Sequence, residues 1–274
     1  MKRPLVSAFV LAAALTSFPC VVLAQGGHNV TLHINPKWKQ CSIQLDPALT
    51  QAAWRQFTGE AGVVTYFRPL TDAAPLGTGR FEVSLLQWQT GIDDEDAAWN
   101  DTFVHPDSTH WLFEGSGLAF PGLTARVGVA PRTDVGVYFT KAIQANYGFY
   151  GAQLQQNVLH DAAQRWSGAV RVSFVNMYGP DDVGFSVFGA DLVTSKTFDV
   201  FSKRVALSPY GTFGASLSRS HEKSAAVSLA DESVWGAHGM VGIAARYSVV
   251  SLGVEYGVAR VQSFSIRLGF GPSR

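Results

Sequence analysis

The chain has 274 residues, with 21 acidic and 21 basic side chains. Only 15% of its residues are charged, 12% are aromatic and 27 are glycines, and no linker or low-complexity tract marks a second domain. This composition excludes a disordered chain and a helical bundle, and the absence of a basic cluster argues against nucleic acid as a partner.

The first 24 residues have the pattern of a secretory signal peptide. Lys2 and Arg3 form a positive n-region, residues 5–15 form an apolar h-region, and small residues ending at Ala24 form a cleavage site. An uncleaved membrane anchor would need about 20 apolar residues. We therefore expect cleavage near Ala24, which leaves Cys41 as the only cysteine and excludes an intrachain disulfide.

Residues 25–79 do not show a repeated strand pattern, and we expect them to form a plug or a periplasmic cover that contains a short helix. Asp46 can cap this helix, with Pro47 at the first helical position. One face of the helix would carry Leu49, Ala53 and Phe57. Residues 63–70 are an alternative strand, which with one more strand would raise the total from ten to twelve.

From residue 80 onward, apolar and polar residues alternate with a period of two, as in strands that have one apolar and one polar face. No stretch of the mature chain reaches 18 consecutive apolar residues, so membrane-spanning helices are excluded. Strands that cross lipid must close into a barrel, because no water is present to satisfy an open edge. The predicted strands are residues 80–90, 117–130, 134–142, 147–158, 167–178, 182–194, 206–219, 235–247, 249–260 and 262–271.

The sequence thus predicts an all-β fold: a single closed, antiparallel, up-and-down transmembrane β-barrel in residues 80–271, preceded by a short N-terminal helix. The predicted connections at residues 131–132, 160–165 and 247–249 are short, whereas those at 93–109 and 221–234 are long and polar. Short turns at one end and longer loops at the other are typical of bacterial outer-membrane barrels. An even number of strands follows if both ends of the barrel are periplasmic.

The end of the chain resembles the C-terminal signature of outer-membrane β-barrels, in which apolar residues alternate and an aromatic residue closes the last strand. The residues that carry the resemblance are Phe264, Ile266, Leu268 and Phe270. The resemblance implies a place in the bacterial outer membrane, in contact with its lipid and lipopolysaccharide, and recognition by the barrel-assembly machinery and periplasmic chaperones. Unlike the usual signature, the chain continues past the aromatic residue through residues 271–274.

A looser resemblance covers residues 80–270. The stretches at residues 123–136, 151–155 and 208–211 are similar to the strand-turn-strand rhythm of uncharacterised bacterial barrels in the outer-membrane β-barrel domain superfamily. This resemblance implies fold and location, and no chemistry.

Five charged residues fall on the polar faces of the predicted strands, where they would line the lumen: Glu82, Arg126, Arg171, Glu255 and Arg267. An arginine facing the middle of the bilayer would cost about 2 to 4 kcal/mol, so we place these side chains inside. They indicate either a pore lining that selects solutes by charge or a plugged interior held by ion pairs. The second is favoured because Tyr138, Phe188 and Tyr210 are also expected inside a narrow barrel. A turn centred on Val261 would place Glu255 directly opposite Arg267.

The leading functional hypothesis is a non-enzymatic outer-membrane barrel that acts as a narrow passive channel or as a structural envelope protein. One alternative is a membrane-embedded lipid hydrolase or deacylase with His221 or His238 as the base, although neighbouring strand residues such as Ser220 and His221 point to opposite faces. Another is a secreted soluble barrel with an apolar interior that binds lipid. The acidic loop at residues 93–96 lacks the spacing of an EF-hand, so we predict no metal site. We also predict no cofactor and no catalytic residue.

Overall fold

The structure is a computed structural model, and it describes residues 42–93, 96–104, 118–141, 145–161, 163–201 and 204–272. The expected signal peptide, its cleavage site near Ala24 and Cys41 lie outside the described residues. Among the described residues, no helix is long and apolar enough to cross a membrane.

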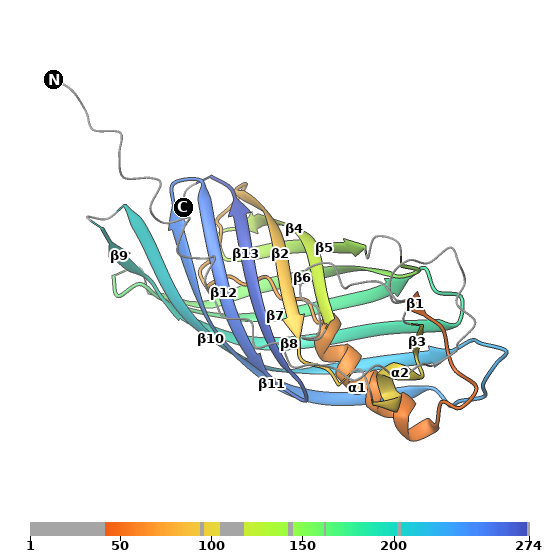
Figure 1. The fold of residues 1–274 in the computed structure, drawn as a ribbon. Coiled ribbons are helices and arrows are strands. Elements are labelled where there is room, and N and C mark those ends of the chain that lie inside the picture. Colours follow the sequence, from red (N-terminus) through yellow and green to blue (C-terminus); the bar gives the residue numbers. More distant parts are fainter. Residues whose placement is uncertain are drawn as a thin grey trace.

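Ten antiparallel strands close into a barrel, with one additional short strand, β9 (Phe198–Val200), attached to β10 (Figure 1). Neighbours along the sequence pair with one another, β10 pairs with β11, and the last strand pairs with β2 to close the ring. The barrel strands are β2 (Phe81–Thr90), β4 (Leu118–Ala130), β5 (Thr133–Lys141), β6 (Gly148–Asp161), β7 (Trp166–Tyr178), β8 (Val183–Lys196), β10 (Val205–Glu222), β11 (Glu232–Tyr247), β12 (Val250–Val258) and β13 (Gln262–Phe270).

Each of the ten predicted strands has a counterpart, so the closed antiparallel barrel is confirmed. The twelve-strand alternative is wrong, because residues 63–65 form the last turn of a helix and residues 66–70 form no strand. The predicted start of that helix is also wrong. The helix α1 (Gln51–Thr65) has Thr50 as its N-cap, whereas the Asp46 carboxylate accepts a hydrogen bond from the Ala48 amide in the turn before it.

The barrel has two unlike ends. At the turn end, the connections at residues 131–132, 162–165 and 248–249 are short, and the one at 197–204, which contains β9, is longer; this end also holds the start of β2 and the end of β13. At the loop end, the connections at residues 91–117 and 223–231 are the longest. This asymmetry follows the sequence-based expectation.

The strands bury polar side chains and expose apolar ones. The outer face carries exposed apolar side chains on all ten barrel strands, and serine, threonine, glutamine and charged residues point inward. Tyr138 and Tyr210 lie inside as expected, but Phe188 is 44% exposed on the outer face, so its expected inward position is wrong. The arrangement is the reverse of what a soluble barrel with an apolar interior requires.

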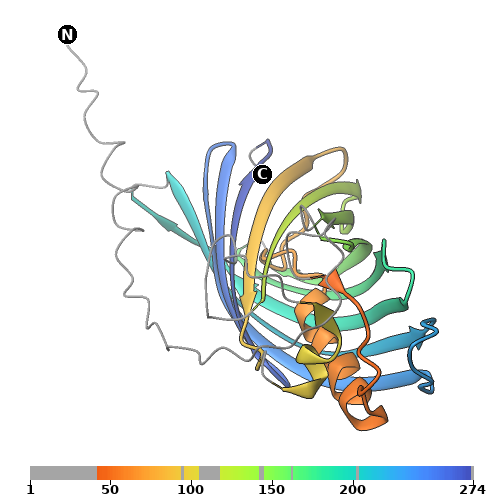
Figure 2. The ribbon, with the colours of Figure 1, turned by 45° about the vertical axis from the view of Figure 1, so that its right-hand side comes forward.

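Two helices and two short strands cover the loop end of the barrel (Figure 2). These elements are α1, α2 (Ala97–Asn100), β1 (Ser42–Ile43) and β3 (Phe103–Val104), and β1 pairs with β3. Their apolar side chains form one aromatic cluster with the inner ends of the strands. The rings of the cluster belong to Trp54, Phe57, Trp99, Phe103, Tyr147, Phe149 and Phe185.

Candidate functional site in the barrel interior

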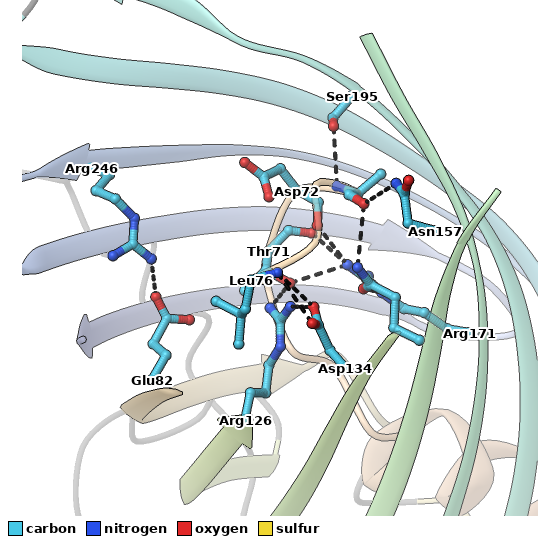
Figure 3. A network of polar contacts seen from close by, with 12 residues as sticks. Thr71, Asp72, Leu76, Glu82, Arg126, Asp134, Asn157, Arg171, Ser195 and Arg246 are labelled. Carbon is cyan, nitrogen blue, oxygen red and sulfur yellow. Dashed lines mark hydrogen bonds and ion pairs between the residues drawn. The ribbon is translucent and has the colours of Figure 1, made fainter. Parts of the chain in front are cut away.

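Residues 66–79, which we call the crossing segment, run through the inside of the barrel from the end of α1 to the start of β2. At the loop end, Trp88 Nε1 of β2 donates a hydrogen bond of 2.7 Å to the Val64 carbonyl, just before the segment. At the turn end, the Gly79 amide donates to the Gly128 carbonyl at 2.7 Å. Between these points, wall side chains hold the segment mainly through its backbone, and Figure 3 shows these contacts.

The first of these contacts is made by Arg126 of β4. Its guanidinium donates to the Thr71 hydroxyl at 2.5 Å and forms an ion pair with Asp134 of β5 at 2.9 Å. The Asp134 carboxylate in turn accepts from the Leu76 amide at 3.1 Å. The ion pair is therefore shared between the wall and the crossing segment, which offsets the cost of burying both charges.

Arg171 of β7 makes the densest set of contacts. Its guanidinium donates to the carbonyls of Thr71 at 2.7 Å and Asp72 at 3.1 Å, and to the Gln155 side chain at 2.7 Å. In Figure 3, the guanidinium groups of Arg126 and Arg171 both point toward Thr71, and Asp72 lies next to Thr71. Two buried arginines thus bracket one short stretch of the segment.

Ala73 is held at both of its peptide groups. Its amide donates to the Ser195 hydroxyl at 3.1 Å, and its carbonyl accepts from Asn157 at 3.0 Å and from Gln155 at 3.3 Å. Four strands supply the polar side chains that bind residues 71–73: β6, β7 and β8, which are neighbours, and β4 through Arg126. The backbone groups of the segment find hydrogen-bond partners in this way although the segment pairs with no strand of the barrel.

The predicted ion pair between Glu255 and Arg267 is wrong in register. The turn between β12 and β13 is centred one residue earlier than expected, so Glu255 lies opposite Ser265 and Arg267 lies opposite Gly253. Both side chains still point inward, as the alternation predicts. Glu255 accepts a hydrogen bond of 3.0 Å from the Tyr210 hydroxyl and is attracted electrostatically by Arg68 of the crossing segment.

The partner of Arg267 is Glu82. This carboxylate on β2 forms ion pairs with both Arg267 and Arg246 and accepts a hydrogen bond from Ser251 at 3.1 Å. All five predicted lumen residues are therefore inside the barrel, between 2% and 4% exposed, and each has polar partners. The structure does not gather them into one site: they divide among three networks, around Arg126 and Arg171, around Glu82, and around Glu255.

A further buried pair joins Asp191 of β8 to His238 of β11, with 2.7 Å between the carboxylate and Nε2. The ring of Tyr66, at the start of the crossing segment, lies 4.5 Å from the His238 ring, centroid to centroid. Tyr66 also fits against Gly189, where a Cβ would collide with its ring. These contacts hold the start of the crossing segment against the inner face of β8 and β11.

Beside the crossing segment, a cavity of about 470 Å³ occupies the turn-end half of the barrel. Thr71, Asp72 and Ala74 of the segment line it, together with Arg246 and other wall residues. Every lining residue on a strand lies in the turn-end half, and the lining includes the exposed side chains of Arg165 and Arg204. The cavity is thus a vestibule at the turn end, and the crossing segment forms part of its lining.

The two histidines considered as catalytic bases are in unlike places. His221 is on the outer side of β10 near the loop end and contacts Asp231 at 2.5 Å, whereas the neighbouring Ser220 points inward and is bonded to Thr58. His238 is buried with Asp191 as described. Within the described residues, no group of three or more His, Cys, Asp or Glu side chains could hold a metal ion. Asp94 and Glu95 of the acidic loop lie outside the described residues.

The C-terminal residues Phe264, Ile266, Leu268 and Phe270 face outward and are 36–49% exposed. Ser265 and Arg267 alternate with them and face inward. The role of the four apolar residues as an assembly signal stays a prediction.

Sequence reasoning missed the uncharged residues that bind the crossing segment. Gln153, Gln155 and Asn157 alternate along β6 and are buried in the interior, and the last two donate to the Ala73 carbonyl. Amide side chains at a period of two on a lumen face would have indicated a wall that binds another segment. Nothing in the pattern of residues 71–76 identifies them as the partners, because they contribute mainly backbone groups.

No protein-family model and no curated protein matches the chain. Among solved structures, it is similar to the β domain of the Bordetella autotransporter BrkA, with 10% identity and a TM-score of 0.40 over 72% of this chain and 100% of that one. It is also similar to the KdgM porin, with 7% identity and a TM-score of 0.31 over 69% and 98%. A third is Ail, the attachment invasion locus protein of Yersinia pestis, with 12% identity and a TM-score of 0.26 over 71% and 98%. Structural similarities with such low sequence identities and TM-scores do not support an inference about function.

Proposed function

We propose that the protein is an outer-membrane barrel closed by its own N-terminal segment, and that it serves as a structural component of the envelope and not as a passive channel. The observation that carries the proposal is the binding of residues 71–76 by side chains from β4, β5, β6, β7 and β8. The segment runs through the lumen between the loop end and the turn end, and its residues Thr71, Asp72 and Ala74 line the vestibule at the turn end.

The outer surface supports insertion in a bilayer. An apolar belt surrounds the barrel, and aromatic side chains flank it at both ends, as in transmembrane barrels. At the turn end these are Trp166, Phe198 and Tyr247, and at the loop end they are Tyr150, Trp235 and Tyr256. The Lys196 ammonium lies 5.1 Å from the centroid of the Trp166 ring, a pairing suited to the interface between lipid and water. The partners proposed on this basis are outer-membrane lipid and lipopolysaccharide.

Assembly completes the proposal. Closure between β13 and β2 removes the free edges of the sheet, and the outward aromatic residue at the end of β13 is the feature that the assembly machinery would recognise. Delivery by periplasmic chaperones follows from the expected export signal.

Electrical recording in planar bilayers tests whether the barrel is closed. The wild-type protein, shown to be inserted by its heat-dependent shift on a gel, is expected to give no steady conductance. A variant with Arg126→Met and Arg171→Met loses the side chains that bracket Thr71 and Asp72, and is expected to open intermittently. The matched control is Arg132→Met, which changes an exposed arginine in the turn between β4 and β5 and should stay silent. Steady, voltage-independent conductance of the wild-type protein would establish a channel and overturn the proposal.

A further inference from the structure

The contacts of the crossing segment show that it runs from the loop end of the barrel to the turn end. The helix before it lies against the loop-end parts of β10 and β11, with Thr58 bonded to Ser220 and Gln51 bonded to Glu232. Along the chain, the wall positions that it meets then move from the loop-end half of the barrel to its turn end. In chain order, the pairs are Val64 with Trp88, Leu70 with Gly253, Thr71 with Arg171, Ala73 with Ser195, Leu76 with Asp134, and Gly79 with Gly128.

The two ends of this path are held at opposite ends of the barrel. At the loop end, Ser42 and Ile43 of β1 pair with β3, which belongs to the long connection between β2 and β4. The Asn146 side chain, from the connection between β5 and β6, also bonds both peptide groups of Ile43. At the turn end, the segment continues directly into β2 through the bonded pair Gly79 and Gly128. Residue 42 is therefore on the loop side and residue 80 on the turn side.

The fit is tight enough to define one path. A Cβ on Gly253 of β12 would lie 2.7 Å from the Leu70 carbonyl oxygen, closer than any ordinary contact. Gly128 lies so close to the backbone of Gly77 that any side chain there would displace it. The wall carries glycine where the segment approaches it most closely.

The length of the segment suits a complete crossing. An extended chain covers at most about 3.3 to 3.6 Å per residue, so residues 66–79 can reach further than the roughly 25 Å height of the apolar band of a transmembrane barrel. In transmembrane barrels of this kind, the connections at one end are longer than those at the other. The end with the longer connections lies outside the cell.

We propose that the barrel presents its own N-terminal cap at the cell surface: the chain crosses the outer membrane once inside the lumen, from Ser42 and α1 on the outside to the start of β2 on the periplasmic side. This inference rests on the proposed membrane insertion and adds to it a topology with the N-terminal part outside. The cap of α1, α2, β1 and β3 then forms part of the protein's surface outside the cell.

Labelling of single cysteines on intact cells tests this topology. In a background with Cys41→Ser, one variant carries Ala48→Cys, an exposed position just before α1. A second carries Ala225→Cys in the connection between β10 and β11, and a third carries Arg132→Cys in a turn at the opposite end. The probe is a maleimide that does not cross the outer membrane, used before and after permeabilisation.

The expected result is labelling of the cysteines at 48 and 225 on intact cells, with the cysteine at 132 labelled only after permeabilisation. Labelling at 225 with protection at 48 would show an inserted barrel whose N-terminal segment does not cross, and would overturn this inference alone. Labelling at 132 with protection at 48 and 225 would mean the opposite orientation and would also overturn it. Recovery of all three variants in the soluble periplasmic fraction would overturn the proposed membrane insertion itself.

Discussion

Helix α1 and the crossing segment are consecutive in sequence and fill the same barrel, yet they are held by different kinds of contact. The helix is held through its side chains: Trp54 and Phe57 stack on each other and pack into the aromatic cluster at the loop end. The crossing segment is held at residues 71–76 mainly through its peptide groups, which bond to side chains of the wall. The first mode depends on the sequence of the N-terminal region, and the second depends on the sequence of the barrel.

The difference follows from what each part offers. A helix satisfies its own backbone and can bury an apolar face without further polar partners. An unpaired extended segment cannot do so, and its buried N–H and C=O groups must bond to something else. The polar lumen of this barrel supplies these partners, so the same interior accommodates both modes.

The largest expected effect is at the helix. Phe57→Ala removes a buried ring that contacts Trp54, Trp99, Phe103 and Phe185, and should lower the free energy of unfolding by about 3 to 5 kcal/mol. Urea unfolding of the detergent-solubilised protein, followed by tryptophan fluorescence, measures it. The control Phe201→Ala changes a ring that is 77% exposed and should cost less than 1 kcal/mol. Equal losses for both variants would mean that the aromatic cluster does not hold the helix.

A smaller loss is expected for one wall side chain that holds the crossing segment. Arg171→Met removes hydrogen bonds to two carbonyls of the segment and should cost about 2 to 3 kcal/mol in the same urea titration, since bonds of charged donors are the stronger kind. The matched change Arg165→Met breaks an exposed ion pair with Asp199, which water screens, and should leave the urea midpoint almost unchanged. If Arg171→Met proves as mild as Arg165→Met, the wall does not hold the segment in the way described.

The smallest expected changes in stability come from one substitution, alanine to serine, made once in the crossing segment and once in helix α1. Ala74→Ser in the crossing segment adds a hydroxyl beside the vestibule and should change stability by less than about 0.5 kcal/mol. Ala61→Ser in α1 buries the same hydroxyl in the apolar cluster and should cost about 1 kcal/mol or more. A larger loss of stability for Ala74→Ser than for Ala61→Ser would show that side chains also determine the binding of the crossing segment. Thermal loss of the folded gel band provides a second measurement of both variants.

Part of the interior could be predicted from the sequence. Alternation alone placed Glu82, Arg126, Arg171, Glu255 and Arg267 inside, because the side-chain period of a strand is two. The pairing of Glu255 with Arg267 could not be derived in the same way. A shift of one residue in the centre of the turn between β12 and β13 moves the facing position by two residues and keeps both side chains on the same face.

The sequence by itself determined the strands, their closure into a barrel and the face on which each side chain lies, because these follow from local periodicity and from the cost of an open edge in lipid. Only the tertiary structure decided the position of residues 66–79 and the partners of the buried charges. The reason is physical: Thr71, Ala73 and Leu76 are bound largely through backbone groups that every residue possesses. Their partners are 50 residues or more away in sequence, so no local pattern records the contact.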